Sequence, residues 1–167
     1  MSGKWIEVAT KANLQNNEHG YQASTNSPIV VTRTCGHIVS VNSKVLEAGI
    51  SVAFSSDAPA TAWADPVNPF VGIQAAVTRR AYDGTDTGQH ERISIEKAIE
   101  LYTKGAQEIT RIQGVGQLKP GYHADFIVLE EDILEIPELE IGNTRVLETF
   151  MAGQSVFRKV SEKTLVV

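Results

Sequence analysis

Asp57 and four histidines are the side chains of this sequence best suited to hydrolytic chemistry. Asp57 lies in the segment SSDAP at residues 55–59, and the histidines are His19, His37, His90 and His123. A hydrolytic metal centre needs several such ligands around a cation, so that bound water loses a proton near neutral pH. The histidines include no HxH pair and no pair four residues apart, so their spacing alone predicts no metal site.

A cysteine and two arginines could also take part in chemistry, but these residues and Asp57 itself have structural interpretations. Cys35 lies close to His37, but a Cys–His nucleophile depends on spatial geometry, and neighbours along a strand point to opposite faces. Arg79 and Arg80 can bind an anionic substrate, or they can be paired arginines at the solvated end of a helix. Asp57 by itself is typical of a turn-capping residue before a proline. None of these patterns defines an activity on its own.

Composition excludes several classes of protein. The chain has 167 residues, 42% of them hydrophobic, which is enough for one domain with a core. Its formal charge of -5 and scattered basic residues argue against a nucleic-acid partner. No stretch approaches the roughly 18 apolar residues of a membrane span, so we expect no membrane association. A single cysteine excludes an internal disulfide, and we expect a cytoplasmic protein.

The first half of the chain shows short alternating elements. SPIVVTRT at residues 27–34 is β-branched and predicts a strand. Asn42 and Ser43 are suitable caps for a short helix over 44–47, which Gly49 would end. The apolar run at 50–54 predicts a buried strand. Three prolines within 58–69 predict a loop, because proline interrupts regular structure.

The second half predicts longer elements. A helix is expected over 70–81. A second helix is expected from a Ser94 cap onward, with Glu96 in its first turn and one apolar face formed by Ile95, Ala98, Ile99, Tyr102, Ala106 and Ile109. After a turn at 119–121, the run FIVL at 126–129 predicts a buried strand. Residues 146–151 and 155–158 then predict a hairpin that turns at Gly153.

Four segments in order resemble the amidohydrolase superfamily, and its amidohydrolase 3 branch most closely. They are SSDAP at 55–59, DPVNPFVGIQAAVTR at 65–79, ERISIEKAIELYT at 91–103 and GQLKPGYHADFIVLEED at 116–132. In that branch the first segment ends the last barrel strand, the third is the helix after it, and the fourth returns to an accessory β-sandwich. The resemblance therefore implies an α/β fold: a remnant of a β/α (TIM-type) barrel plus strands of that sandwich.

The resemblance also implies roles for particular residues. Asp57 would bind zinc or another divalent metal, or act as the proton-transferring base, at the carboxyl-terminal mouth of the barrel. His37 would contact a small-molecule substrate in a complete enzyme. The family's HxH pair, bridging ligand and two later histidines have no identifiable counterparts here. We therefore expect the family chemistry, metal-dependent hydrolysis of C–N or related bonds, to be incomplete in this chain.

The resemblance divides the chain into three segments. Residues 1–54 resemble an earlier part of the family, because RTCGHIVSVNSKVLEAGI at 33–50 usually lies far upstream, residues 55–115 resemble the end of the barrel, and 116–167 resemble the sandwich. An internal shortening near 46–50 is one hypothesis that explains this order. A non-catalytic binding or regulatory fragment is the alternative function, and open strand edges predict a homo-oligomer.

Overall fold

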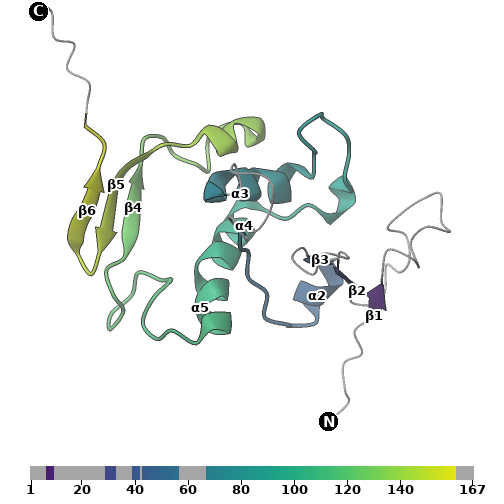
Figure 1. Cartoon of the computed structure of the whole chain (residues 1–167), viewed down its shortest axis with the longest axis horizontal. Coiled ribbons are helices and arrows are strands. Elements are labelled where there is room, and N and C mark those ends of the chain that lie inside the picture. Colours follow the sequence, from purple (N-terminus) through teal and green to yellow (C-terminus); the bar gives the residue numbers. More distant parts are fainter. Residues whose placement is uncertain (1–6, 10–28, 33–38, 42, 57–66, 161–167) are drawn as a thin grey trace, which may run out of the picture.

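The computed structural model describes residues 7–9, 29–32, 39–41, 43–56 and 67–160, which combine helices with two small sheets (Figure 1). The sheet of strands β4, β5 and β6 lies at one end of the molecule, and the sheet of β1, β2 and β3 with helix α2 lies at the other. This mixture confirms the expected helix and strand content. A barrel remnant stays a prediction, because the described strands form two separate three-stranded sheets.

The amino-terminal sheet has the order β1-β2-β3. Strand β1 (Glu7–Ala9) pairs in parallel with β2 (Ile29–Thr32), and β2 pairs antiparallel with β3 (Val39–Val41). The strand predicted from SPIVVTRT is thus confirmed as β2. The short helix predicted next is α2 (Ser43–Glu47), which buries Val45 to 1% exposure.

Residues 50–54 do not form the predicted strand. They follow α2 without pairing to another strand in the described part of the chain, and all but Ser51 are partly buried. The N–H of Phe54 donates instead to the carbonyl of Leu101, at 3.2 Å. An apolar run indicates burial but not the partner of its backbone, and here that partner is a helix.

Helix α3 (Pro69–Thr78) confirms the helix predicted over 70–81, with earlier bounds. Pro69 begins the helix and does not extend the loop, since proline is tolerated in the first turn. Asn68 caps it by accepting a hydrogen bond from the N–H of Phe70 at 3.0 Å. The helix ends at Arg79, which has a left-handed backbone with φ of 49°.

The single long helix predicted after Ser94 is two helices, α4 (Ile95–Tyr102) and α5 (Lys104–Thr110). Ser94 caps α4 as expected, accepting from the N–H of Lys97 at 3.2 Å. The break lies at Thr103, whose φ and ψ of -113° and -86° are not helical. Its carbonyl packs against Gly116, where a Cβ would come within 2.7 Å. Tertiary packing thus interrupts a continuous apolar periodicity.

The carboxyl-terminal sheet is an antiparallel meander. Strand β4 (Phe126–Leu129) pairs with β5 (Val146–Met151), and β5 pairs with β6 (Gln154–Arg158). The hairpin turns through Ala152 and Gly153, both with positive φ, as a two-residue hairpin turn requires. The strands are confirmed, but the predicted burial of β4 is wrong, because Ile127 and Val128 are 46% and 40% exposed.

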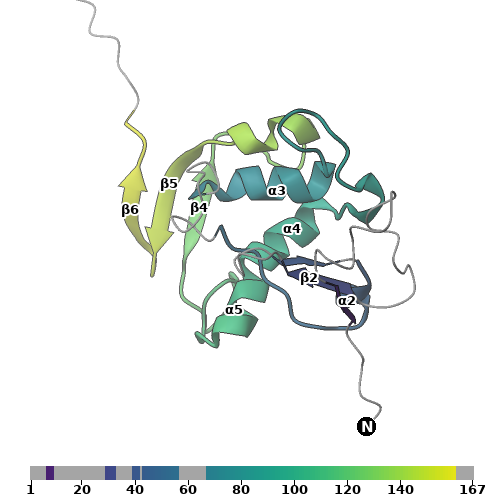
Figure 2. The ribbon, with the colours of Figure 1, turned by 45° about the vertical axis from the view of Figure 1, so that its right-hand side comes forward.

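The core lies where α3, α4 and the segment between β4 and β5 meet (Figure 2). A 3-10 helix, η2 (Gln89–Glu91), precedes α4, and another, η3 (Glu138–Asn143), packs along α3. The buried core residues are Phe70, Ile73, Val77, Ala98, Ile133 and Ile141. None of the helices in the described ranges is long and apolar enough to cross a membrane.

Candidate functional site

Asp57 and His37, the two site residues predicted from sequence, lie outside the described residues, as does His19. The structure therefore reaches the predicted site through the segment that precedes it, residues 50–56. This segment ends at Ser56, next to Asp57 in the sequence. The structure shows how residues 50–56, which precede Asp57 in the sequence, are held.

Two contacts hold the middle of the segment 50–56 against the helices. The N–H of Phe54 donates to the carbonyl of Leu101, and the carbonyl of Val52 lies so close to Gly105 that a Cβ there would approach to 2.5 Å. Both contacts involve the neighbourhood of the break between α4 and α5. These contacts hold the segment against helix backbone, and it pairs with no strand of the described ranges.

Tyr102 contacts this segment, and both Tyr102 and Phe54 pack against the core. Its ring meets Phe54 edge to face, with centroids 5.4 Å apart and planes at 69°. Its hydroxyl lies against Gly72 of α3, where any Cβ would overlap it. Burial raises the pKa of the Tyr102 phenol above its ordinary value of 10.0.

The two described histidines do not form a metal site. His90 lies in η2 and is exposed, whereas His123 is exposed in the loop before β4, where its N–H donates to the carbonyl of Gly114 at 2.7 Å. Among residues with described positions, no three His, Cys, Asp or Glu side chains are close enough together to hold a cation. The described residues therefore do not fit the divalent metal that the resemblance implies.

Arg79 has a structural role at the end of α3. Its Nη2 donates to the carbonyl of Thr87 at 2.9 Å, and its own carbonyl accepts from the N–H and Oγ1 of Thr87. The backbones of Arg80 and Asp86 form an isolated antiparallel β-bridge. Hydrogen bonds from the N–H groups of Gly88 and Gln89 lower the pKa of the Asp86 carboxyl. These contacts close the loop that follows α3 and favour the structural interpretation of the two arginines.

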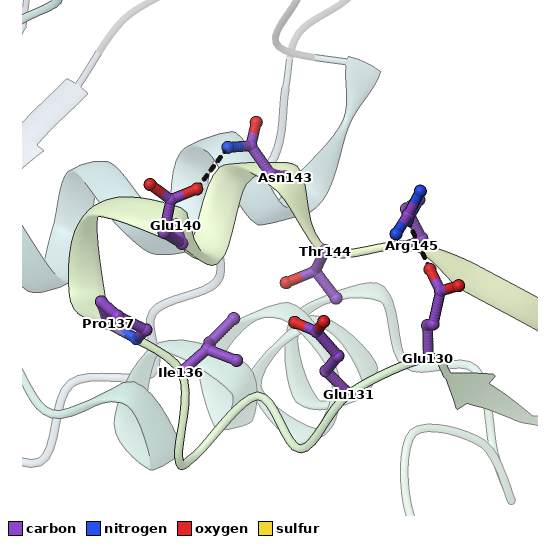
Figure 3. Close-up of a pocket in the computed structure, with 8 residues that line it drawn as sticks. All are labelled: Glu130, Glu131, Ile136, Pro137, Glu140, Asn143, Thr144 and Arg145. Atoms are coloured by element: carbon purple, nitrogen blue, oxygen red, sulfur yellow. Dashed lines mark hydrogen bonds and ion pairs between the residues drawn. The ribbon is translucent and has the colours of Figure 1, made fainter.

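A polar cavity of about 360 Å³ lies between β4, η3 and β5 (Figure 3). Three carboxylates line it, but Glu130 is paired with Arg145, and Glu140 accepts a hydrogen bond from Asn143 at 2.7 Å. The buried Thr144 hydroxyl lies at its wall with no partner in the described part of the chain. The cavity is acidic but its carboxylates are largely committed to structural bonds.

A second cavity, of about 390 Å³, lies at the start of α4. Its walls are mainly the aliphatic side chains of Val77, Ile93, Ile95, Ile133, Leu134, Ile136 and Ile141, with Arg92, Ser94, Glu96 and Glu138 as the polar part of the lining. It contains no nucleophile paired with a base and no cluster of metal ligands. Its composition is that of a packing groove.

Comparison with known proteins identifies the relationship. The family model described as "Amidohydrolase family" matches residues 43–157. This chain belongs to the amidohydrolase family. The Bacillus subtilis (strain 168) protein named "Putative amidohydrolase YtcJ" is 34% identical over 119 residues, which cover 69% of this chain and 22% of that protein. No solved structure matches the chain significantly.

The amidohydrolase match confirms the resemblance read from the four segments, and it adds two observations. It begins at Ser43, the first residue of α2, and ends within β6, so its bounds include the segment 50–56. The chain also spans only 22% of the length of the curated relative that it matches.

The contacts of Tyr102 were missed from sequence. Gly105, a glycine inside an apparent helix, was the signal available, because such a glycine often marks a close approach of another backbone.

Proposed function

We propose that this chain is a catalytically incomplete part of a hydrolase for C–N or related bonds, in which Asp57 is its contribution to the reacting centre. The observation that carries the proposal is the family match over 43–157, which includes SSDAP at residues 55–59. The same sequence contains no HxH pair. The family relationship supports the chemistry, and the missing ligands support its incompleteness.

The proposed arrangement follows the resemblance. Residues 55–115 would correspond to the end of a β/α barrel and residues 116–167 to the accessory sandwich. A carboxylate after the last barrel strand would face the carboxyl-terminal mouth, where barrel enzymes keep their reacting groups. His37 would contact a small-molecule substrate in that arrangement. A complete member of the family uses a divalent metal such as zinc, which would supply an activated water when bound.

The described residues of this chain do not fit a metal ion. What the chain itself provides is a framework that holds residues 50–56 against α4 and α5. A single carboxylate leaves a cation coordinated mostly by water, so the affinity for zinc should be weak. Incompleteness is therefore the expected state of the isolated chain.

The test is a hydrolysis assay on the purified protein with added zinc or manganese. Simple amides, cyclic imides and esters should be hydrolysed no faster than in buffer, and Asp57→Asn should leave that result unchanged. Calorimetry should show no sub-micromolar zinc site. Turnover that disappears in Asp57→Asn while the fold survives would refute incompleteness and show that the chain is an enzyme by itself.

A binding role is the second candidate, and the carboxyl-terminal sheet favours it. Its exposed apolar side chains are Ile127, Val128, Met151, Val156 and Phe157, each 40–59% exposed. Because neighbours along a strand point to opposite faces, these side chains are divided between the two faces of the sheet. Within the described ranges β4 and β6 each pair with β5 alone, so both edges of the sheet can receive another strand.

We propose a second copy of the chain as the partner of this sheet. Glu131 and Asp132 follow β4, whereas Arg158 ends β6 and Lys159 follows it. The two basic side chains form ion pairs within the chain, Arg158 with Glu148 and Lys159 with Glu130. Strand β4 contains no charged residue and no proline, the two features that commonly prevent edge pairing. Joining the β4 edge of one copy to the β6 edge of the next is a head-to-tail contact that each further copy can repeat. The assembly should therefore grow with concentration.

A further inference from the structure

Helix α3 carries no charge along its whole length. Its sequence is PFVGIQAAVT, and its two polar side chains make hydrogen bonds within the protein. The Thr78 hydroxyl donates to the Gln74 carbonyl at 2.8 Å, and Oε1 of Gln74 accepts from the N–H of Gly142. A helix that is apolar on every side is usually buried on every side. The composition of α3 therefore predicts contacts around its full circumference.

Within the described ranges, α3 is covered on one side only. Helices η3 and α4 pack against it (Figure 2), and its residues Phe70, Ile73 and Val77 are buried in the core between them. Val71 is 38% exposed, and Ala75 is exposed as well. Residues four apart lie on the same side of a helix, so Val71 and Ala75 form one uncovered apolar face.

Opposite charges lie at the two ends of this face. Arg80 is exposed just beyond the last turn of α3 and makes no ion pair among the described residues. Glu140 is exposed near the first turn, where it accepts a hydrogen bond from Asn143 at 2.7 Å. The adjacent Gly142 carbonyl accepts from Asn68, the residue that caps α3. Such a face is complementary to itself when two copies run antiparallel.

We propose that the uncovered face of α3 is a contact between two copies of this chain, related by a two-fold axis with their α3 helices antiparallel. Ala75 lies near the middle of the helix and therefore near the axis. Arg80 of each copy faces Glu140 of the other, since a two-fold contact pairs the same two residues twice. Antiparallel helices also bring opposite ends of their dipoles together.

This contact is distinct from the one proposed for the carboxyl-terminal sheet, because it uses different elements. It closes at two copies, whereas a head-to-tail contact of the sheet can be repeated. The test therefore uses the full chain with Phe157→Lys, which weakens the sheet contact. Sedimentation equilibrium should give a mass that rises with concentration and levels at twice the 18.2 kDa of one chain.

Adding Ala75→Lys to this chain should raise the dissociation constant of the dimer by about tenfold or more, because two like charges would meet at the axis. Lysine is a good helix former, so the fold should survive, which circular dichroism checks. If it does not fold, Val71→Lys places a charge on the same face. The matched control is Ile109→Lys on α5, 49% exposed, which should change the constant by less than about twofold.

An exchange of charges tests the antiparallel arrangement. Arg80→Glu and Glu140→Arg should each raise the dissociation constant about threefold or more, because each places two like pairs across the contact. The double variant restores opposite charges and should return to within about twofold of the parent. Double and single variants with equal constants would overturn the antiparallel arrangement.

A Phe157→Lys chain that stays monomeric at every concentration would overturn the α3 contact and leave the sheet contact standing. Equal constants for Ala75→Lys and Ile109→Lys would also overturn it. None of these measurements involves turnover, so the hydrolysis assay bears on the proposed function alone.

Discussion

Gln74 and Gly142 are hydrogen-bonded across 68 positions of sequence: the Gly142 N–H donates to Oε1 of Gln74 at 2.7 Å. Asn68 reinforces the contact, since its Nδ2 donates to the Gly142 carbonyl at 3.1 Å. Both backbone groups of one glycine are therefore satisfied by side chains of the α3 region. This pair of bonds fixes η3, and with it the core residue Ile141, against α3.

Replacing Gln74 by alanine should destabilise the protein. The partly buried Gly142 N–H would lose its acceptor, and an unsatisfied polar group of this kind costs about 1–3 kcal/mol. Urea unfolding should show a lower midpoint with an unchanged slope. Gln113→Ala is the matched control, because Gln113 is exposed and its change should stay within about 0.5 kcal/mol. Equal effects of the two substitutions would contradict the role of the Gly142 contact.

Gly105→Ala tests the close approach of residue 52. Alanine in a helix is favoured over glycine by about 1 kcal/mol, so propensity alone predicts a gain in stability. The added Cβ would lie 2.5 Å from the Val52 carbonyl oxygen, and overpacking of this kind costs about 1–3 kcal/mol. Since the obstacle is backbone, the clash should prevail and the midpoint of thermal unfolding should fall.

The control for Gly105→Ala is Glu108→Ala on the same helix. Glu108 is exposed, and its Oε1 lies 3.9 Å from Nζ of Lys104. A surface ion pair of this kind contributes little to stability. The Glu108 substitution should change the free energy of unfolding by less than about 0.5 kcal/mol. A Gly105→Ala protein that is more stable than wild type would show that residues 50–56 do not pack as described.

Glu148 should give the fold a measurable pH dependence. Hydrogen bonds from the Ser155 hydroxyl, and then from the Arg158 guanidinium, hold the pKa of this carboxyl below its ordinary value of 4.5. The unfolded chain therefore binds the proton more readily. The resulting stabilisation is fully present above pH 4.5 and is lost as pH falls through the lower folded pKa.

Unfolding of wild type and Glu148→Gln should be compared between neutral pH and pH 3. The advantage of wild type should be constant near neutrality and shrink below pH 4.5. In Ser155→Ala, which removes the larger cause of the shift, the folded pKa should lie closer to 4.5, so the stabilisation should be smaller and its loss should be complete at a higher pH. A wild-type advantage that stays the same down to pH 3 would argue against these bonds in solution.

The carboxyl-terminal sheet should mediate association. Light scattering should give a mass above the 18.2 kDa of one chain, and this mass should rise with protein concentration. Phe157→Lys on β6 should lower it, because a charge on an edge strand opposes pairing. Leu139→Lys is the control, since Leu139 is similarly exposed, at 59%, but lies on η3. A monomer at high concentration would refute the proposed partner.

Family membership was determined by the sequence alone, because it depends on residue types in a fixed order. The same holds for most elements whose signals are local. Ser94 caps a helix as predicted, and the hairpin turns at Gly153 as predicted, with positive φ at Ala152 and Gly153. Each of these features is decided within a few residues, so neighbours in sequence suffice to predict it.

The tertiary structure alone decided what each apolar run packs against. Residues 50–54 were predicted as a strand, but they pair with no strand in the described part of the chain. The N–H of Phe54 donates instead to the carbonyl of Leu101. Val128 was predicted to be buried, yet it is 40% exposed. Hydrophobicity specifies a tendency to leave water but not the surface that receives the side chain. That surface is set by contacts between distant residues, as between Tyr102 and Phe54 at the approach to Asp57.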